Sequence, residues 1–230
     1  MKFIVAGVGP GDPDLVTTGA LKAIRSAGLV LSPHSRAERA SVAEAAVRAH
    51  IPELETAPVV FPMTSDAQKR DAELKAQLEA LRPRWEHAET IVLPVIGDST
   101  LYATGFYLYE LWKELVPELE LVLLPGISAH CLAAAKSGHF LAMGQEILTI
   151  VPATAEPEKI AAALKATDAA AVYKPVALRE QLRPVVESAG PWARILRIDR
   201  AGLPDQKIFE GSAALDPAEE YLSILLLWRS

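Results

Sequence analysis

The sequence contains a single cysteine, Cys131, so no disulfide can form within one chain. An oxidising compartment is therefore not implied. We interpret Cys131 as a small apolar residue on a helix, because no residues typical of an activated nucleophile accompany it. His34, His130 and His139 do not combine with it at a spacing typical of zinc, and we expect no metal site.

Long apolar runs are also lacking. The most apolar stretch, residues 221–228 (YLSILLLW), is far shorter than the ~20 residues that a membrane-spanning helix needs. The apolar run at the N-terminus is too short for a signal peptide and is interrupted by Pro10 and Asp12. We therefore expect a cytoplasmic protein with no membrane partner.

Excess positive charge is absent as well. The 23 Lys and Arg residues are outnumbered by 29 Asp and Glu residues, which gives a formal net charge of -6. This balance argues against the basic surface of a nucleic-acid-binding protein, and we expect no nucleic-acid partner. The chain of 230 residues, half of them apolar, is long enough to bury a core in one large α/β unit or two small domains.

Short apolar runs alternate with helical patterns along the chain, and several of the runs are apolar on both faces, as strands covered by helices are. This alternation predicts an α/β protein with a largely parallel sheet in its first half and antiparallel strands at its end. We place the domain boundary near 116–120, which gives domains 1–116 and 117–230. The expected strands are 2–9, 29–33, 90–97, 119–126, 146–153, 169–174, 194–199 and 221–228.

The helical segments carry recognisable start and stop signals. A helix is expected over 66–87, where leucines and a tryptophan form one apolar stripe, and Pro83 should kink or end it. Asp12 and Pro13 fit the N-cap and first position of the first helix. Gly105 lies in a later helix, where replacement by alanine is expected to be neutral or mildly stabilising.

The first glycine-rich stretch, GVGPGDPD at residues 7–14, resembles a nucleotide loop only in part. The dinucleotide fingerprint requires a glycine where Asp12 stands, and no acidic residue follows the second strand to hold a ribose. Pro10 lacks an N–H for a phosphate, and no Gly-Lys-Ser/Thr completes a Walker loop. The missing acidic residue also counts against the common methyltransferase fold, so a simple strand-to-helix turn stays an alternative.

Two further turns lie at strand ends. Gly97 and Asp98 follow one apolar strand, and Pro125 and Gly126 follow the next, with Ser128 placed as an N-cap. Ligands of open α/β sheets bind at the carboxyl ends of strands. Three such turns together indicate a bound small molecule with amide-like and hydroxyl groups.

Taken together, GVGPGDPDLVTTGALKAI, GDSTLY, PGIS and DRAGLPDQKIFEG resemble the tetrapyrrole methylases, in the right order and over nearly the whole chain. The resemblance implies two α/β domains, each a mixed sheet flanked by helices, with S-adenosyl-L-methionine between them. Within the family, VVFPMTSD, LYATGFYLYELW and LVLSPHS resemble enzymes that methylate C(20) of precorrin-2 or cobalt-factor II in cobalamin biosynthesis. The family also implies a homodimer and a tetrapyrrole substrate.

The resemblance assigns roles to residues at the strand ends. Ser99 departs from the family, which usually has proline there. The implied substrate-binding residues are His34, Arg36 and Arg200, with His34, Tyr102 and Lys174 as candidates for a base and no catalytic residue assigned. The implied cofactor-binding residues are Pro10, Gly97, Asp98, Ser99, Tyr102, Ser128, Ala129, Ala153, Tyr173, Lys174 and Ala201.

Several alternatives stay open at this point. A methylase of the same fold could act on another ring carbon, or on a protein or RNA target, although the acidic net charge disfavours RNA. A non-catalytic tetrapyrrole- or nucleotide-binding module is a second alternative. An NAD-linked oxidoreductase is a third, weakened by Asp12 and by the missing ribose-binding acid.

Overall fold

The computed structural model describes residues 1–36, 40–64 and 66–230, and the chain forms two compact units, Met1–Ser128 and Ala129–Ser230. The strand Glu120–Leu124 pairs with the first strand of the chain and so belongs to the first unit. The division therefore falls after this strand rather than between residues 116 and 117. Pro117 and its acidic neighbours form a turn within the first unit instead of a linker.

The first unit is built on a five-stranded sheet with the order β3-β2-β4-β1-β5. Every strand pairing among its described residues is parallel, as the strand–helix alternation predicts. All five carboxyl ends therefore lie at one edge of the sheet. The strands are β1 (Lys2–Gly7), β2 (Leu29–His34), β3 (Ala57–Val60), β4 (Thr90–Val95) and β5 (Glu120–Leu124).

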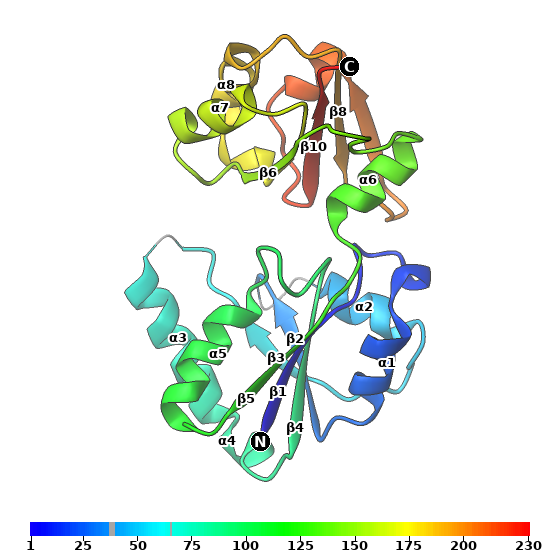
Figure 1. The fold of residues 1–230 in the computed structure, drawn as a ribbon. Helices are drawn as coiled ribbons and strands as arrows, with labels where there is room; N and C mark the ends of the chain where they lie inside the picture. The colour runs from blue at the N-terminus through cyan, green and yellow to red at the C-terminus, as the bar shows by residue number, and fades with distance from the viewer. Residues whose placement is uncertain (37–39, 65) are drawn as a thin grey trace. The chain divides into compact units, whose positions relative to one another are not determined.

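Helices cover both faces of this sheet (Figure 1). On one face, α1 (Thr18–Arg25) and α2 (Val42–Arg48) pack their apolar residues against Ala6, Val30 and Val92. On the other face, α3 (Ala67–Ala80), α4 (Arg82–Trp85) and α5 (Gly105–Leu115) pack around Phe3 and Leu93. This double coverage explains why the strands read as continuous apolar runs.

Two helix starts and one edge strand differ from the sequence prediction, besides shifts of one or two residues at strand ends. The segment 66–87 divides at Leu81 into α3 and α4, because Pro83 is tolerated in the first turn of a new helix but not inside an old one. Asp12 does cap a helical turn, but this turn is the 3-10 helix Pro13–Leu15. The helix α1 begins later, with Thr17 as its N-cap. The short edge strand β3 is missed by the sequence, because Pro58 interrupts its strand signal.

The sequence predicts that replacing Gly105 by alanine is neutral or mildly stabilising, but the structure indicates that this substitution is destabilising. Gly105 begins α5 and is buried, and a Cβ atom there would lie 2.7 Å from both methyl carbons of Val5. We expect Gly105→Ala to lower the free energy of unfolding by about 1–3 kcal/mol, because the added methyl overpacks a core that contains a stiff side chain. Urea unfolding measures this change.

Gly19→Ala is the matched control for Gly105→Ala. Gly19 is an exposed helical glycine in α1, and its added Cβ would only approach Thr17 Oγ1 at 3.9 Å. This variant should be neutral or more stable than the wild type. Equal stability of the two variants would contradict the close packing of Gly105 on Val5.

The second unit is built on a five-stranded mixed sheet with the order β6-β7-β10-β8-β9. β6 and β7 are parallel, whereas β10 is antiparallel to β7 and β8, and β9 is antiparallel to β8. The predicted antiparallel end of the chain is confirmed. The strands are β6 (Leu148–Pro152), β7 (Ala169–Tyr173), β8 (Arg194–Asp199), β9 (Lys207–Glu210) and β10 (Ser223–Trp228).

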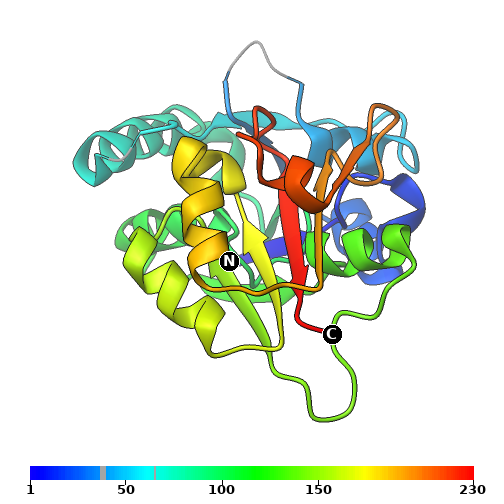
Figure 2. The same ribbon diagram turned by 90° about the horizontal axis from the view of Figure 1, so that it is seen from above.

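Helices α7 (Pro157–Lys165) and α8 (Leu182–Ser188) cover one face of the second sheet, and α6 (Ala129–Ser137) packs on the other, beside β10 (Figure 2). Ile160, Leu182 and Val186 form the helical side of the core, opposite Leu225 and Leu227 of β10. In the part of the chain that the structure describes, no helix is long and apolar enough to cross a membrane.

Candidate functional site

Loops from β1 and β4 meet at the carboxyl edge of the first sheet. Gly9 and Gly97 form an isolated antiparallel bridge, in which Gly97 N donates to Gly9 O at 2.7 Å and Gly9 N donates to Gly97 O at 3.2 Å. The first two glycine-rich turns of the sequence are thus joined by backbone hydrogen bonds. Pro10, which the resemblance assigns to the cofactor site, is buried in the first of these loops.

The loop after β5 joins the same cluster. A Cβ atom on Gly7 would lie 2.7 Å from Gly126 N and 2.8 Å from Gly97 O, so the three backbones lie close together and leave no room for a side chain on Gly7 or Gly126. Asp98 ties the loops together, because its carboxylate accepts hydrogen bonds from Gly126 N and Thr100 N, both at 2.8 Å. Asp98 therefore organises the loops, a role that the sequence did not reveal.

The cluster offers both space and a polar group to a ligand. Gly97 has a φ of +77°, and a Cβ atom there would meet no described atom within 4 Å. Ser99 is 5% exposed, and its Oγ has no hydrogen-bond partner among the described residues. The open space at Gly97 and the unpaired hydroxyl of Ser99, two residues further on, are both features of loops that bind molecules with hydrogen-bonding groups.

Tyr102 and Arg36 lie at the same edge but are more exposed. Tyr102 has a φ of +53° and lies in the loop that leads into α5, and partial burial raises the pKa of its phenol. Arg36 follows β2 and is exposed. Ser128 and Ala129 follow the loop after β5, where Ala129 begins α6, and both are half-buried.

His34 ends β2 and belongs to a chain of polar side chains. Ser32 Oγ lies 2.9 Å from His34 Nε2 and also donates a hydrogen bond to the Glu44 carboxylate. Arg48 Nε donates to Glu44 Oε1 at 2.5 Å. The sequence indicated His34 alone, because Glu44 and Arg48 are joined to it through Ser32 only once α2 packs on the sheet.

The predicted residues of the second unit share one edge of the second sheet. Because β10 is antiparallel to both β7 and β8, the strands β6, β7 and β8 all point the same way. Their carboxyl ends place Ala153, Tyr173, Lys174, Arg200 and Ala201 at that edge. Ala153 N donates to Tyr173 O at 2.8 Å, and Ala153 is 2% exposed, which fixes the spacing of two of these ends.

Side chains at this edge have partners that the sequence did not predict. Tyr173 Oη lies 2.7 Å from Nδ1 of His130 on α6. Arg200 Nε lies 2.6 Å from Asp205 Oδ2, and the hydrogen bond from Arg200 lowers the pKa of the Asp205 carboxyl. Burial lowers the pKa of Lys174, whose backbone is left-handed with a φ of 56°. The positive charge of Arg200 is therefore partly balanced within the chain.

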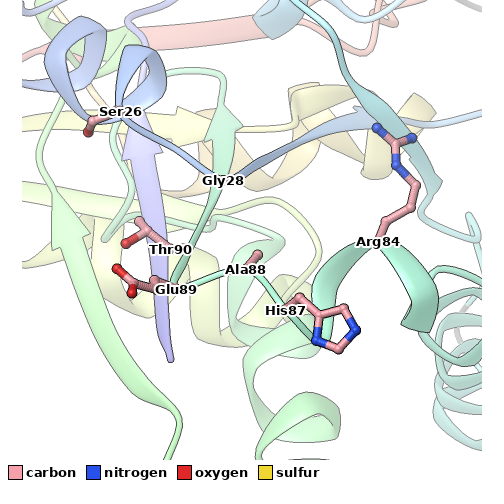
Figure 3. Close-up of a pocket in the computed structure, with 7 residues that line it drawn as sticks. All are labelled: Ser26, Gly28, Arg84, His87, Ala88, Glu89 and Thr90. Atoms are coloured by element: carbon pink, nitrogen blue, oxygen red, sulfur yellow. The ribbon is translucent and has the colours of Figure 1, made fainter.

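A pocket of roughly 430 Å³ lies at the opposite, amino-terminal edge of the first sheet (Figure 3). It is lined by Ser26 and Gly28 before β2 and by Glu89 and Thr90 at the start of β4, with Arg84 and His87 beside them. Figure 3 shows these polar side chains spread along the pocket and not converging on one point. None of the predicted site residues lies there, and the described residues hold no cluster of three or more metal-binding side chains.

Two α/β units, each with predicted site residues at the carboxyl ends of its strands, define the architecture. The family of Tetrapyrrole (Corrin/Porphyrin) Methylases matches residues 2–216, and the chain belongs to this family. The chain is thus a member of a family of methylases, and the predicted fold class is confirmed.

Among its relatives is a precorrin-2 C(20)-methyltransferase of a Sinorhizobium species, with 25% identity over 98% of this chain and 94% of the relative. A cobalt-precorrin-2 C(20)-methyltransferase of Salmonella typhimurium is 27% identical over 90% of this chain and 86% of the relative. The fold matches that of a uroporphyrin-III C-methyl transferase from Thermus thermophilus, solved as a complex with S-adenyl homocysteine. That structure has a TM-score of 0.70 and 18% identity, over 99% of this chain and 97% of the other.

Proposed function

We propose that this protein transfers a methyl group from S-adenosyl-L-methionine to C(20) of precorrin-2 or of its cobalt counterpart, in cobalamin biosynthesis. The observation that carries the proposal is the likeness to two C(20)-methyltransferases over nearly the whole chain, within a methylase family. S-adenosyl-L-methionine, when bound, supplies a methyl group on a sulfonium that is already a good leaving group. Orientation of the two reactants is then most of what the protein contributes.

The first unit supplies the proposed cofactor contacts with the best structural support. Gly97 leaves open space, Ser99 offers a buried hydroxyl, and Asp98 holds the neighbouring loops in place. Serine at position 99, where the family usually has proline, thus adds a hydroxyl to the proposed site. The remaining contacts proposed in this unit are Pro10, Tyr102 and Ser128.

In the second unit, Ala129, Ala153, Tyr173, Lys174 and Ala201 stay proposed cofactor contacts. The substrate carries several carboxylates, and His34, Arg36 and Arg200 are proposed to meet them, since arginine binds carboxylates in a bidentate manner. The location of the cofactor between the domains, the homodimer and the cytoplasmic location stay predictions.

A methylase of this fold that acts on a different ring carbon or on a protein target is the alternative. One relative supports a different ring carbon: a cobalt-precorrin-4 C(11)-methyltransferase of Priestia megaterium is 25% identical over 90% of this chain. The C(20) relatives match over as much of the chain or more, which favours C(20). Product analysis by NMR separates the two ring positions.

Two assays test the proposed function. In calorimetry, S-adenosylhomocysteine should bind and NAD should not, because the glycine loop departs from the dinucleotide fingerprint at Asp12. In oxygen-free turnover assays, precorrin-2 and its cobalt counterpart are compared side by side, and at least one should gain a methyl group at C(20). Binding of NAD without binding of the thioether, or methylation at another carbon, would overturn the proposal.

A further inference from the structure

The loop that follows β8, residues 200–206, is held together by its own hydrogen bonds. Leu203 N donates to Arg200 O, and Gln206 N donates to Leu203 O, both at 3.0 Å. Gly202 N donates to Oε1 of Gln206 at 2.9 Å. These bonds define where residue 205 lies relative to Arg200, which directly follows the carboxyl end of β8.

The carboxylate of Asp205 contacts the side chain of Arg200 from this loop. Its Oδ2 lies 2.6 Å from Arg200 Nε, and Nε is shielded from solvent although 22% of the Arg200 side chain is exposed. The pKa of the Asp205 carboxyl is lowered chiefly by the hydrogen bond from Arg200, and the charges of Arg200 and Lys207 contribute less. The contact therefore orients the guanidinium in addition to balancing its charge.

The two terminal nitrogens of the Arg200 guanidinium differ from Nε. In the described part of the chain, Nη1 and Nη2 donate no hydrogen bond, and Asp205 is the only acidic residue paired with this side chain. Nη1 and Nη2 together form the planar fork with which arginine binds a carboxylate in a bidentate manner. A guanidinium held at Nε presents this fork in one orientation.

We propose that Asp205 is a positioning residue that holds Arg200 by Nε, so that Nη1 and Nη2 bind a carboxylate of the tetrapyrrole substrate. The carboxylate half of this proposal rests on the proposed function. An arginine side chain that is ordered before binding loses less conformational freedom when the substrate binds, which we expect to raise the affinity about threefold to tenfold. A contact made equally before and during methyl transfer affects KM and leaves kcat unchanged.

The contact between Asp205 and Arg200 is tested in the ligand-free protein by 1H–15N spectra of the arginine Nε groups. Arg200→Lys identifies the Arg200 signal. In the wild type this signal should lie away from those of exposed arginines and exchange slowly with water, because Nε is shielded and bonded. Asp205→Ala should move it to the position of exposed arginines. A wild-type signal already at that position would overturn the proposal.

Asp205→Asn is the conservative variant for both halves of the proposal. It removes the same charge as Asp205→Ala but keeps an oxygen that can accept from Arg200 Nε. The Arg200 signal of Asp205→Asn should therefore stay close to that of the wild type. Because the two variants have equal net charge, the difference between them isolates the hydrogen bond.

Oxygen-free kinetics with precorrin-2 and its cobalt counterpart test the carboxylate half. Asp205→Ala should have a KM for the methylated tetrapyrrole about threefold to tenfold above that of Asp205→Asn. The values of kcat and the affinity for S-adenosylhomocysteine should stay within twofold of the wild type. Arg200→Lys, which keeps the charge but lacks the fork, should raise KM at least as much as Asp205→Ala.

Glu210→Ala is the matched control for Asp205→Ala. Glu210 is 62% exposed, against 60% for Asp205, and its carboxylate lies 3.0 Å from Nη2 of Arg194. Arg194 begins β8, so this pair lies at the opposite end of that strand from Arg200. Glu210→Ala should leave KM and the Arg200 signal unchanged. Folding of each variant is checked by circular dichroism.

The outcomes separate the two proposals. A wild type that methylates neither tetrapyrrole overturns the proposed function and the carboxylate half, while the spectra still decide whether Asp205 holds Arg200. In an active enzyme, equal KM values of Asp205→Ala and Asp205→Asn overturn the positioning role. A KM of Asp205→Ala below that of the wild type also overturns it, because Asp205 would then compete with the substrate for Arg200. An unchanged KM in Arg200→Lys overturns the contact with the substrate.

Discussion

Replacing Arg197 by methionine is expected to lower the free energy of unfolding of the second unit by about 3–5 kcal/mol. Arg197 and Asp199 are each 4% exposed, and Arg197 Nε lies 3.2 Å from Asp199 Oδ1. The guanidinium also donates to the Ala214 and Asp216 carbonyls and lies 4.3 Å from the ring centre of Phe209. Without Arg197 the Asp199 carboxylate is left buried and uncompensated.

Urea unfolding, followed by far-UV circular dichroism and tryptophan fluorescence, measures this effect. Arg183→Met is the matched control in the same unit: its ion pairs with Asp216 and Glu187 are partly exposed, so its loss should cost about 1 kcal/mol or less. The double variant Arg197→Met/Asp199→Leu should recover part of the stability, because it removes the unpaired charge. An Arg197→Met variant as stable as Arg183→Met would contradict the energetic importance of the buried pair.

Gly97→Ala is expected to weaken the binding of S-adenosylhomocysteine at least tenfold, which corresponds to about 1.4 kcal/mol. The added methyl group meets no described atom within 4 Å, so it enters the open space in which the cofactor is proposed to bind. The fold should survive, at a cost of about 1–2 kcal/mol for alanine in the left-handed region. Valine is a poorer choice, because a β-branched residue is strongly disfavoured at this φ of +77°.

The control for Gly97→Ala is an alanine substitution at another glycine with positive φ, one that lies outside the proposed cofactor site. Gly138 has a φ of +68°, and a Cβ atom there also meets no described atom within 4 Å, but it follows α6 and has no predicted role in binding. Gly138→Ala should lose similar stability and keep full affinity in calorimetry. Equal affinities of the two variants would remove Gly97 from the cofactor site.

The strands were predictable because apolar runs bounded by turn residues mark them locally. The strand 194–199 has the same bounds in the sequence prediction and in the structure. The sequence reading of Gly105 was wrong, because its packing against Val5 depends on how α5 lies on the sheet. The positions of the strands in the sequence do not define how α5 lies on the sheet.

In the candidate site, too, features marked by neighbouring residues were predicted from the sequence, whereas contacts between distant residues were missed. The glycine turns were found because they lie directly after apolar runs, and their bridge at Gly9 and Gly97 follows from parallel neighbouring strands. The partners Ser32–Glu44, His130–Tyr173 and Arg200–Asp205 were missed. Glu44 lies on a later helix, His130 on an earlier helix and Asp205 in the loop after β8, and no spacing rule links a strand end to side chains in such different places.

The close approach of Gly7, Gly97 and Gly126 has a consequence for recombining this chain with its relatives. These residues follow or end three different strands, yet each occupies space that a side chain on another would need. A chimera that exchanges the loop carrying Gly7 or Gly126 can be accommodated only if the incoming loop also has glycine at the contact. Crossover points are therefore best placed so that residues 1–12 and 95–128 come from the same parent, whereas replacing an internal segment that begins and ends within 40–64 leaves this contact intact.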